Sequence, residues 1–388
     1  MLKDLSWPAL SAGLLVAFVG FASTFAVVVQ GLRAVGASPA EAASGLMALS
    51  IAMGLCGAAL SLWRRMPISV AWSTPGVALL ATAGAPDGGF AAAVGAFLVC
   101  GALVVIAGLW RPLGRWVSRI PAPLANAMLA GVLLGLCLAP VRAVAELPLV
   151  GLAVAVAWAV VAAWRRLLAM PAAVVVAVLG IVFTTDMPAL PAEALWPTPV
   201  LIAPTFELAA IIGIAVPLFI VTMASQNIPG MAVLHVNGYR PDPGPLFQVT
   251  GWFSLAAAPF GGHVINLAAL TAALCAGPDA HPDPAKRYWA AVIGGVGYVL
   301  FGLLAGVATA FISASPPVLI EAVAGLALLG AFGAAMMNAL KADEHREAAV
   351  VCFVVTASGL AFVGIAGAFW GLLAGGAVMG LGRLRSRP

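Results

Sequence analysis

The segment MPISVAWSTPGVALL, residues 66–80, places Ser73 and Thr74 directly before Pro75 and Gly76 inside an otherwise apolar run. Proline in a first helical turn, with serine or threonine at the cap, is a start signal for a helix. The pattern therefore predicts an extended approach and then a half-helix that begins near residue 74. Its free N–H groups and positive dipole end would favour a carboxylate at the membrane midplane. The alternative is an ordinary kinked helix whose Ser and Thr side chains bond their own backbone.

A second interrupted segment, APFGGHVINLAALTAAL, occupies residues 258–274. Gly261 and Gly262 permit an irregular entry, and His263 and Asn266 are three residues apart, on one helical face. We expect a second half-helix to begin here and to face the first in antiparallel fashion. His263 is the only histidine within an apolar span, and its ordinary pKa of about 6.5 suits a group that gains and loses a proton. The alternative is a hydrogen-bonded packing residue.

Composition sets the class of the protein. The chain has 388 residues, of which 63% are hydrophobic and 8% charged, and its mean hydropathy is +1.10. Soluble domains carry about 25% charged residues. The sequence therefore predicts an all-α polytopic membrane protein, and the net charge of +4 is too modest to indicate nucleic acid as a partner.

Several function classes lack support in the sequence. There is no phosphate-binding Walker loop, dinucleotide fingerprint, zinc spacing or nucleophile elbow, and the five cysteines fall in apolar runs without a CxxC spacing. We therefore expect no enzyme activity, cofactor or metal site. The acidic residues fall in loops, in tails or near the starts of spans. An anionic substrate would meet no repelling carboxylate in the interior.

The apolar runs predict fourteen transmembrane segments, because about 20 apolar residues cross a bilayer. The third, ninth and tenth are short for complete spans. The expected segments lie near residues 8–31, 39–63, 67–84, 89–110, 121–140, 147–164, 169–185, 207–228, 244–258, 261–277, 288–311, 316–339, 348–363 and 365–382.

Loop charges agree with this count. With a cytoplasmic N-terminus, all 18 Lys and Arg residues except Arg33 and Arg142 fall on the cytoplasmic side, together with the C-terminus. Such asymmetry is the positive-inside pattern. Losing or adding one span in the middle would destroy it.

The two halves of the chain also resemble each other. Seven spans in each half would make this an inverted repeat, in which short, Gly/Pro-interrupted spans mark the binding site of a secondary transporter. Here those are the third and tenth spans. The matched segments are 22–36 with 224–238, 73–84 with 266–277, and 108–131 with 302–325.

Two amides mark a further break. In MASQNIPG, residues 223–230, Gln226 and Asn227 are followed by Pro229-Gly230, which we expect to interrupt the helix. An unpaired polar group in hydrocarbon costs several kcal/mol, so this pair suggests a bound polar group. The repeat pairs this stretch with the first span, where aromatic and hydroxyl residues could line the same pocket. The candidate substrate-binding residues are Phe21, Thr24, Ser73, Thr74, Gly76, Gln226, Asn227, Gly262, His263 and Asn266.

At this point the motifs resemble a known family. MPISVAWSTPG (66–76), MASQNIPGMAVL (223–234), APFGGHVINLAALTAALCAG (258–277) and GAFWGLLAG (367–375) are similar to the benzoate:proton symporter family, the BenE type. The resemblance covers nearly the whole chain. It implies a bacterial inner-membrane importer of benzoate or a related aromatic acid, driven by protons. It also implies the fold of nucleobase–ascorbate transporters and anion exchangers, whose members are often homodimers.

In that fold, seven plus seven inverted helices form a core domain and a gate domain. The ranges implied here are 1–118 and 207–314 for the core, 119–186 and 315–388 for the gate, and 187–206 for the inter-repeat connection.

The resemblance also places site residues. In nucleobase symporters, acidic residues on the eighth and tenth spans bind substrate and take part in proton coupling, and those places fall on Gln226 and His263 here. The lack of a carboxylate at both suits an anionic substrate. The expected carboxylate site lies between Thr74 and His263, with Gln226 and Asn227 donating hydrogen bonds. The proton carrier is then His263 or the substrate carboxylate itself.

Two other functions stay open. One is a nucleobase or inorganic-anion carrier or channel on the same fold. The other is a structural or receptor-like membrane protein that transports nothing, which the paired polar breaks argue against.

Overall fold

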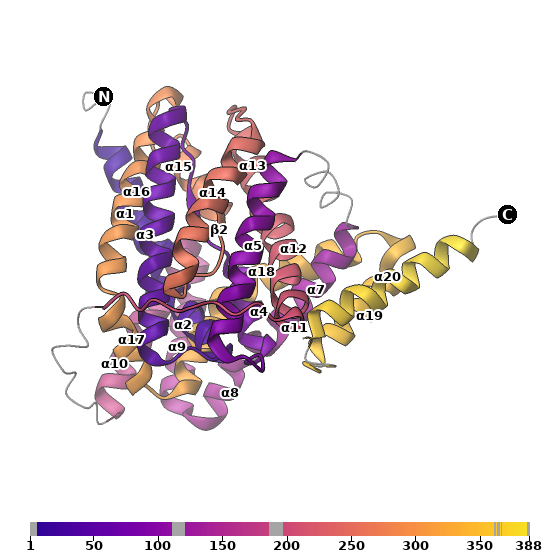
Figure 1. The fold of residues 1–388 in the computed structure, drawn as a ribbon. Coiled ribbons are helices and arrows are strands. Elements are labelled where there is room, and N and C mark those ends of the chain that lie inside the picture. The colour runs from indigo at the N-terminus through magenta and orange to yellow at the C-terminus, as the bar shows by residue number, and fades with distance from the viewer. Residues whose placement is uncertain are drawn as a thin grey trace.

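The computed structural model describes residues 6–110, 121–185, 197–360, 362, 365 and 367–385, and these are mostly helical (Figure 1). The expected domain boundaries at 118–119 and 186–187 lie outside the described residues, as does the connection up to residue 196. The rest of that connection, 197–206, runs extended across the bundle, where the Val200 N–H donates to Ser44 Oγ (2.9 Å). Also outside the described residues are the expected cytoplasmic cations Lys3, Arg111, Arg115, Arg119 and Arg387.

The helices and strands divide between the two halves of the chain. The first half contains α1 (Trp7–Ala22), α2 (Phe25–Ala34), α3 (Pro39–Arg64), β1 (Val70–Trp72), α4 (Thr74–Ala83), α5 (Gly89–Leu109), α7 (Ala122–Cys137), α8 (Ala139–Glu146), α9 (Pro148–Arg165), the 3-10 turn η2 (Arg166–Leu168) and α10 (Ala169–Thr184). The second half contains α11 (Leu208–Ala210), η4 (Ile211–Ala215), α12 (Val216–Thr222), η5 (Met223–Asn227), α13 (Ile228–Val236), α14 (Pro243–Ala257), η6 (Ala258–Phe260), β2 (Ile265–Leu267), α15 (Leu270–Ala276), η7 (Pro284–Lys286), α16 (Tyr288–Leu303), α17 (Ala305–Ala314), α18 (Pro317–Leu340), η8 (Asp343–His345), α19 (Arg346–Ala357) and α20 (Gly367–Arg385).

The two interrupted segments cross as a short antiparallel pair of strands. β1 pairs with β2 so that Val70 lies opposite Leu267 and Trp72 opposite Ile265. The pairing continues beyond the strands, because the Ser73 N–H donates to the Val264 carbonyl (3.2 Å). At membrane depth no water satisfies backbone groups, so each break supplies the hydrogen-bond partners that the other lacks.

The first half-helix begins where the sequence predicts. α4 starts at Thr74, and the Ser73 side chain caps it by accepting a hydrogen bond from the Gly76 N–H (3.2 Å). The expected start of the second half-helix near His263 is wrong. Residues 265–267 are extended in β2, and α15 begins only at Leu270. A helix could not start at His263 without removing the pairing with β1.

The expected interruption at Pro229 is also wrong. One continuous helix runs over Leu208–Val236. It contains π turns at Ile211–Ala215 and Met223–Asn227, and the second directly precedes the proline-containing turn. A proline ring clashes with the carbonyl four residues earlier in a regular α-helix. The wider π turn accommodates Pro229 without ending the helix.

Helix lengths test the number of spans. Among the described residues, seven helices are long and apolar enough to cross a membrane, or eight if the pair α16 and α17, bent by 54°, is one span. α4, α10 and α20 are shorter apolar helices. Every expected span overlaps at least one helix of the described chain, but α14, α15 and α19 are in neither group, and the count of fourteen stays a prediction.

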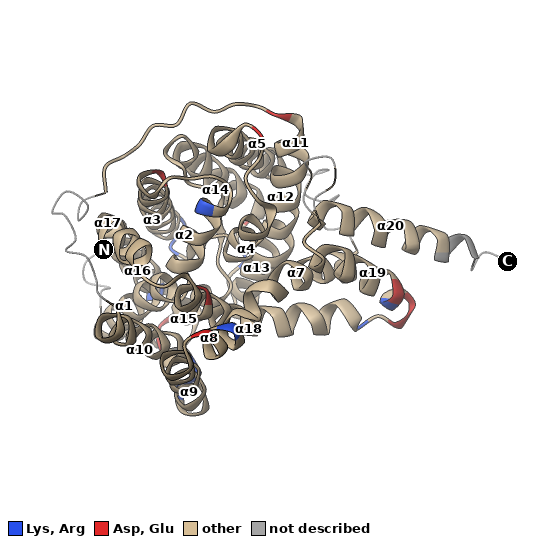
Figure 2. Ribbon diagram, turned by 90° about the horizontal axis from the view of Figure 1, so that it is seen from below, with Lys and Arg blue, Asp and Glu red and all other residues tan. Residues whose placement is uncertain are grey.

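Close helix packing builds the centre of the bundle. α3 packs against α16, α5 against α14 and α7 against α18, while α19 and α20 project to one side in both views (Figures 1 and 2). Gly54 and Gly295 lie where α3 meets α16: a Cβ added at Gly295 would lie 2.5 Å from the Gly54 carbonyl oxygen. Small residues allow such backbone approach in membranes.

We expect Gly295→Leu to lower the stability of the folded protein by about 1–3 kcal/mol or more, because overpacking forces the two helices apart. The control is Gly135→Ala on α7, since a Cβ there meets nothing within 4 Å. Thermal unfolding of the detergent-purified proteins measures both. An unchanged melting temperature for Gly295→Leu would contradict the close packing of α3 and α16.

Candidate functional site

A cavity of about 530 Å³ lies where α1, β1 and the starts of α4 and α15 face α9, α10 and α18. Small-molecule sites typically enclose about 300–1,000 Å³. One wall comes from elements expected in the core and the other from elements expected in the gate. The polar residues that line it are Ser23, Thr24, Thr74, Arg166, Gln226, Thr271 and Tyr298.

The N-terminus of α4 opens onto this cavity through Thr74 and Pro75. Ser73 is fully buried, and its hydroxyl is occupied by the Gly76 N–H and by Thr222, which donates to it at 2.8 Å. Gly76 packs against α12, since an added Cβ would lie 2.4 Å from Leu218 Cδ1. Ser73 and Gly76 therefore position the helix start, while Thr74 reaches the cavity.

The adjacent amides of the π turn point to different places. Gln226 is half-buried and lines the cavity, and no hydrogen bond joins its side chain to another residue in the described part of the chain. Asn227 is fully buried. Its Oδ1 accepts a hydrogen bond from the Leu267 N–H (2.9 Å), and its Nδ2 donates to Met223 Sδ (3.1 Å). Gln226 is thus available to a ligand, whereas Asn227 holds β2 in place.

The residues expected on the second break do not line the cavity. His263 is 1% exposed, and its ring lies edge-on to Phe97, with centroids 6.3 Å apart. Neither ring nitrogen has a hydrogen-bond partner among the described residues. Asn266 is fully buried in β2, where its amide, oriented to match its neighbours, accepts from the Ser73 N–H (3.0 Å). Gly262 packs against Ala257.

Aromatic and hydroxyl side chains of the first span and of β1 form one part of the site. Trp72 and Thr24 both line the cavity, and the Trp72 indole N–H donates to Thr24 Oγ1 (2.9 Å). Phe21 is buried behind them, stacked between Phe25 and Phe301 at centroid distances of 5.4 and 5.0 Å. It supports the wall rather than lining it.

The structure therefore brings Thr24, Thr74 and Gln226 together around one cavity. The other predicted site residues lie outside its lining, namely Phe21, Ser73, Gly76, Asn227, Gly262, His263 and Asn266.

Among the lining residues that sequence reasoning missed are Trp158, Arg166, Thr271 and Tyr298. Tyr298 is a hydroxyl inside an apolar span, a signal that could have found it; its O–H donates to the Val16 carbonyl (3.2 Å). Thr271 Oγ1 is hydrogen-bonded to Ser69 Oγ (2.7 Å). Arg166 fits the positive-inside pattern as an ordinary loop cation, so nothing in the sequence marks it.

The charged groups of the site are of one sign only, among the described residues. Arg166 is the only charged residue among the described residues that line the cavity, and no Asp or Glu is among them. Figure 2 shows the coloured acidic and basic segments mainly at helix ends and connections. In the part of the chain that the structure describes, no group of three His, Cys, Asp or Glu side chains could hold a metal ion.

Comparisons with known proteins give the family. The family model described as benzoate membrane transport protein, BenE, matches residues 3–381. The chain is 40% identical over 375 residues to "Inner membrane protein YdcO" of Escherichia coli (strain K12), covering 95% of this chain and 94% of that one. It is 32% identical over 373 residues to "Benzoate membrane transport protein" of Acinetobacter baylyi (strain ATCC 33305 / BD413 / ADP1), covering 96% and 94%.

Two solved structures share the fold at low identity. The transmembrane domain of the cyanobacterial bicarbonate transporter BicA matches with a TM-score of 0.57 at 16% identity, covering 98% of this chain and 97% of that one. The murine anion transporter Slc26a9, in an inward-facing state, matches with a TM-score of 0.62 at 14% identity, covering 99% and 69%. The polytopic helical architecture is therefore one that membrane transporters use.

The match over nearly the whole chain, the two relatives above 30% identity and the shared fold agree with one another. This chain belongs to the benzoate membrane transport protein family, a family of transporters rather than enzymes.

Proposed function

We propose that this protein imports benzoate or a similar aromatic carboxylate together with protons across the bacterial inner membrane. The observation that carries the proposal is the cavity between α4 and the α9–α10 pair. Its described lining holds one arginine, no carboxylate and the positive end of a helix dipole, all of which favour an anion. Trp158, Met170 and Leu326 give it an apolar side. An aromatic carboxylate has one anionic end and one apolar ring, and the lining suits both.

The substrate pose follows from the polar groups that are still available. We place the carboxylate near Thr74, where Gln226 donates a hydrogen bond, and the ring against the apolar side. Ser73, Gly76, Asn227, Gly262, Asn266 and Phe21 would act indirectly, through the contacts that hold the walls.

The transport cycle is also proposed. Fourteen spans in an inverted repeat would form a core and a gate that rock against each other around the cavity. The packing supports this, because the pairs α3–α16 and α5–α14 correspond to one another under the matched halves. Both termini would be cytoplasmic, by the loop charges, and the protein would form a homodimer, by analogy of fold.

An inorganic-anion carrier or channel is the second candidate. It is favoured by the fold shared with BicA, named as a bicarbonate transporter, and with Slc26a9, named as an anion transporter. A nucleobase carrier belongs to the same alternative.

We expect proteoliposomes containing the protein to accumulate labelled benzoate when an inward proton gradient is applied. Accumulation should be saturable and should collapse when a protonophore removes the gradient, because symport draws its driving force from the proton. Empty liposomes control for passive entry of the neutral acid.

Other outcomes would exclude parts of the proposal. Uptake that is indifferent to the gradient removes the symport claim. Non-saturating anion currents in planar bilayers indicate a channel. Competition by uracil but not by unlabelled benzoate indicates a nucleobase carrier.

His263 is our candidate proton carrier. Its ring nitrogens are buried and have no hydrogen-bond partner among the described residues, so neither nitrogen is committed to a structural hydrogen bond. We expect His263→Gln to abolish gradient-driven accumulation while benzoate-for-benzoate exchange continues, because exchange needs no net proton movement.

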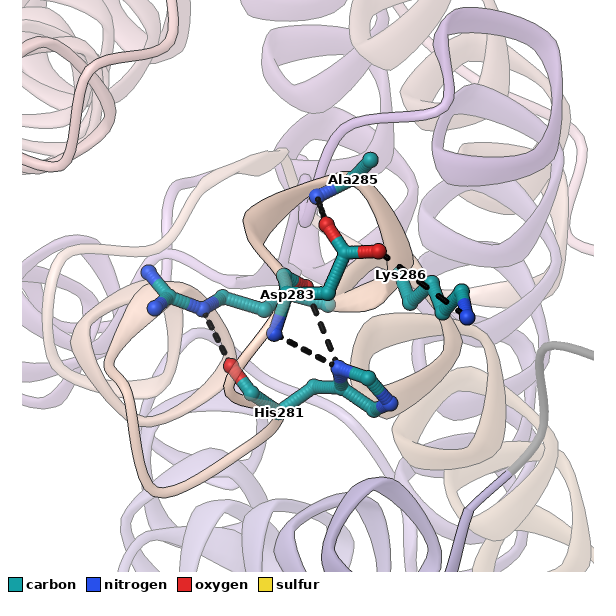
Figure 3. Close-up of polar contacts among 5 residues, drawn as sticks. His281, Asp283, Ala285 and Lys286 are labelled. Carbon is teal, nitrogen blue, oxygen red and sulfur yellow. Dashed lines mark hydrogen bonds and ion pairs between the residues drawn. The ribbon is translucent and has the colours of Figure 1, made fainter.

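The matched control is His281→Gln. His281 lies in the loop before α16, where its Nδ1 accepts a hydrogen bond from the Asp283 N–H (2.9 Å), next to the weak Lys286–Asp283 ion pair at 3.9 Å (Figure 3). This variant should accumulate benzoate normally. Full accumulation by His263→Gln would instead assign the proton to the substrate.

The neighbouring amides give a third test. Gln226→Ala should weaken benzoate binding about tenfold or more at an unchanged melting temperature, because a hydrogen bond to a charged group contributes about 1.5–3 kcal/mol. Asn227→Ala should lower stability by about 1–3 kcal/mol, because it leaves the buried Leu267 N–H without its acceptor. Equilibrium binding and thermal unfolding separate the two, and the reverse pattern would contradict the assignment.

A further inference from the structure

One charged side chain at the cavity has no assigned role. Arg166 begins η2, the short turn that joins α9 to α10, and it lines the cavity from that side. The ion pairs among the described residues involve Lys286, His345 and Arg346, not Arg166. A guanidinium is always charged at physiological pH. The cavity therefore carries a positive charge that the described part of the protein does not neutralise.

The guanidinium of Arg166 lies close to Gly330 on α18. A Cβ added at Gly330 on α18 would meet one neighbour, Arg166 Nη2, at 3.9 Å. The side chain thus extends from the α9–α10 turn to α18, and Gly330 itself lines the cavity. Thr74 and Gln226 line the same cavity from the other wall. An anion inside it would lie between the start of α4 and the guanidinium.

The neighbouring arginine serves as an internal comparison. Arg165 ends α9 and, like Arg166, is exposed, but it does not line the cavity. Both arginines fit the positive-inside pattern equally well. If the positive-inside pattern were the only reason for these two arginines, a ligand in the cavity would interact equally with both.

We propose that Arg166 is the counter-ion of the carboxylate substrate and that it selects carboxylates over neutral isosteres of the same shape. The planar guanidinium can pair with a carboxylate through two parallel hydrogen bonds, which gives geometric as well as electrostatic selectivity. The bound carboxylate would then contact both walls of the cavity, α4 and Gln226 on one side and the α9–α10 turn on the other. This inference rests on the proposed function, in that it takes an aromatic carboxylate as the substrate.

The first test is equilibrium binding of labelled benzoate to the full-length protein in nanodiscs, without any gradient. Arg166→Gln should weaken binding about 10- to 100-fold, since hydrogen bonds to charged groups contribute about 1.5–3 kcal/mol and each 1.4 kcal/mol is a factor of ten. The affinity for benzamide, the neutral isostere, measured by competition, should be unchanged. The ratio of the benzoate affinity to the benzamide affinity should therefore fall. Arg166→Lys should bind with intermediate affinity, and Arg165→Gln like the unaltered protein.

A second measurement needs no substitution. Phenylglyoxal modifies accessible arginines, and mass spectrometry can follow Arg165 and Arg166 separately. Benzoate should slow the modification of Arg166 and leave that of Arg165 unchanged, while benzamide should protect neither. This arm decides the question even if Arg166→Gln does not fold.

The outcomes separate the inference from the proposed function. If the unaltered protein binds no benzoate, the proposed function is wrong. If it binds benzoate but Arg166→Gln binds equally well, or benzoate protects both arginines alike, the role of Arg166 is wrong while the proposed function stands.

Discussion

The structure depends on one constraint, that backbone polar groups at membrane depth must find partners within the protein. Two helices are broken near the centre of the bundle, and each break exposes N–H and C=O groups that lipid cannot satisfy. The crossing of β1 and β2 solves both at once, since Ser73 donates to the Val264 carbonyl and Ala268 to the Ser69 carbonyl. Only after this pairing can α4 present a capped but open N-terminus to a cavity.

The same constraint decides which polar side chains remain free for a ligand. Asn227 gives its oxygen to the Leu267 N–H of β2, and Ser73 gives its hydroxyl to the α4 cap. Gln226, one residue from Asn227, lies on a different side of the helix and lines the cavity instead. A sequence can indicate that polar residues gather at a break. It cannot divide them between scaffold and site, because that division depends on which backbone groups the opposite break leaves unpaired.

Local signals were readable in the sequence and long-range ones were not. The start of α4 follows from Ser73 and the proline in the first turn, which act within one helical turn. The start of α15 at Leu270 depends on strand pairing with residues about 200 positions earlier in the chain. No residue next to Leu270 in the sequence indicates that pairing. Pro229 predicts a helix break from its local sequence, but the preceding π turn accommodates the proline and the helix continues. Arg166 looks like any loop cation, because hydropathy does not reveal that the turn between α9 and α10 borders a cavity.

A cationic cavity also bears on where the proton travels. Carboxylic acids have ordinary pKa values of about 4, and a nearby cation lowers the pKa further by stabilising the charged form. If Arg166 faces the substrate as proposed, the site favours the anion and disfavours the neutral acid, so the proton must be carried by another group. His263 is buried against Phe97 of α5 and does not line the cavity. If His263 is that group, as proposed, protons must reach it by a route other than this cavity.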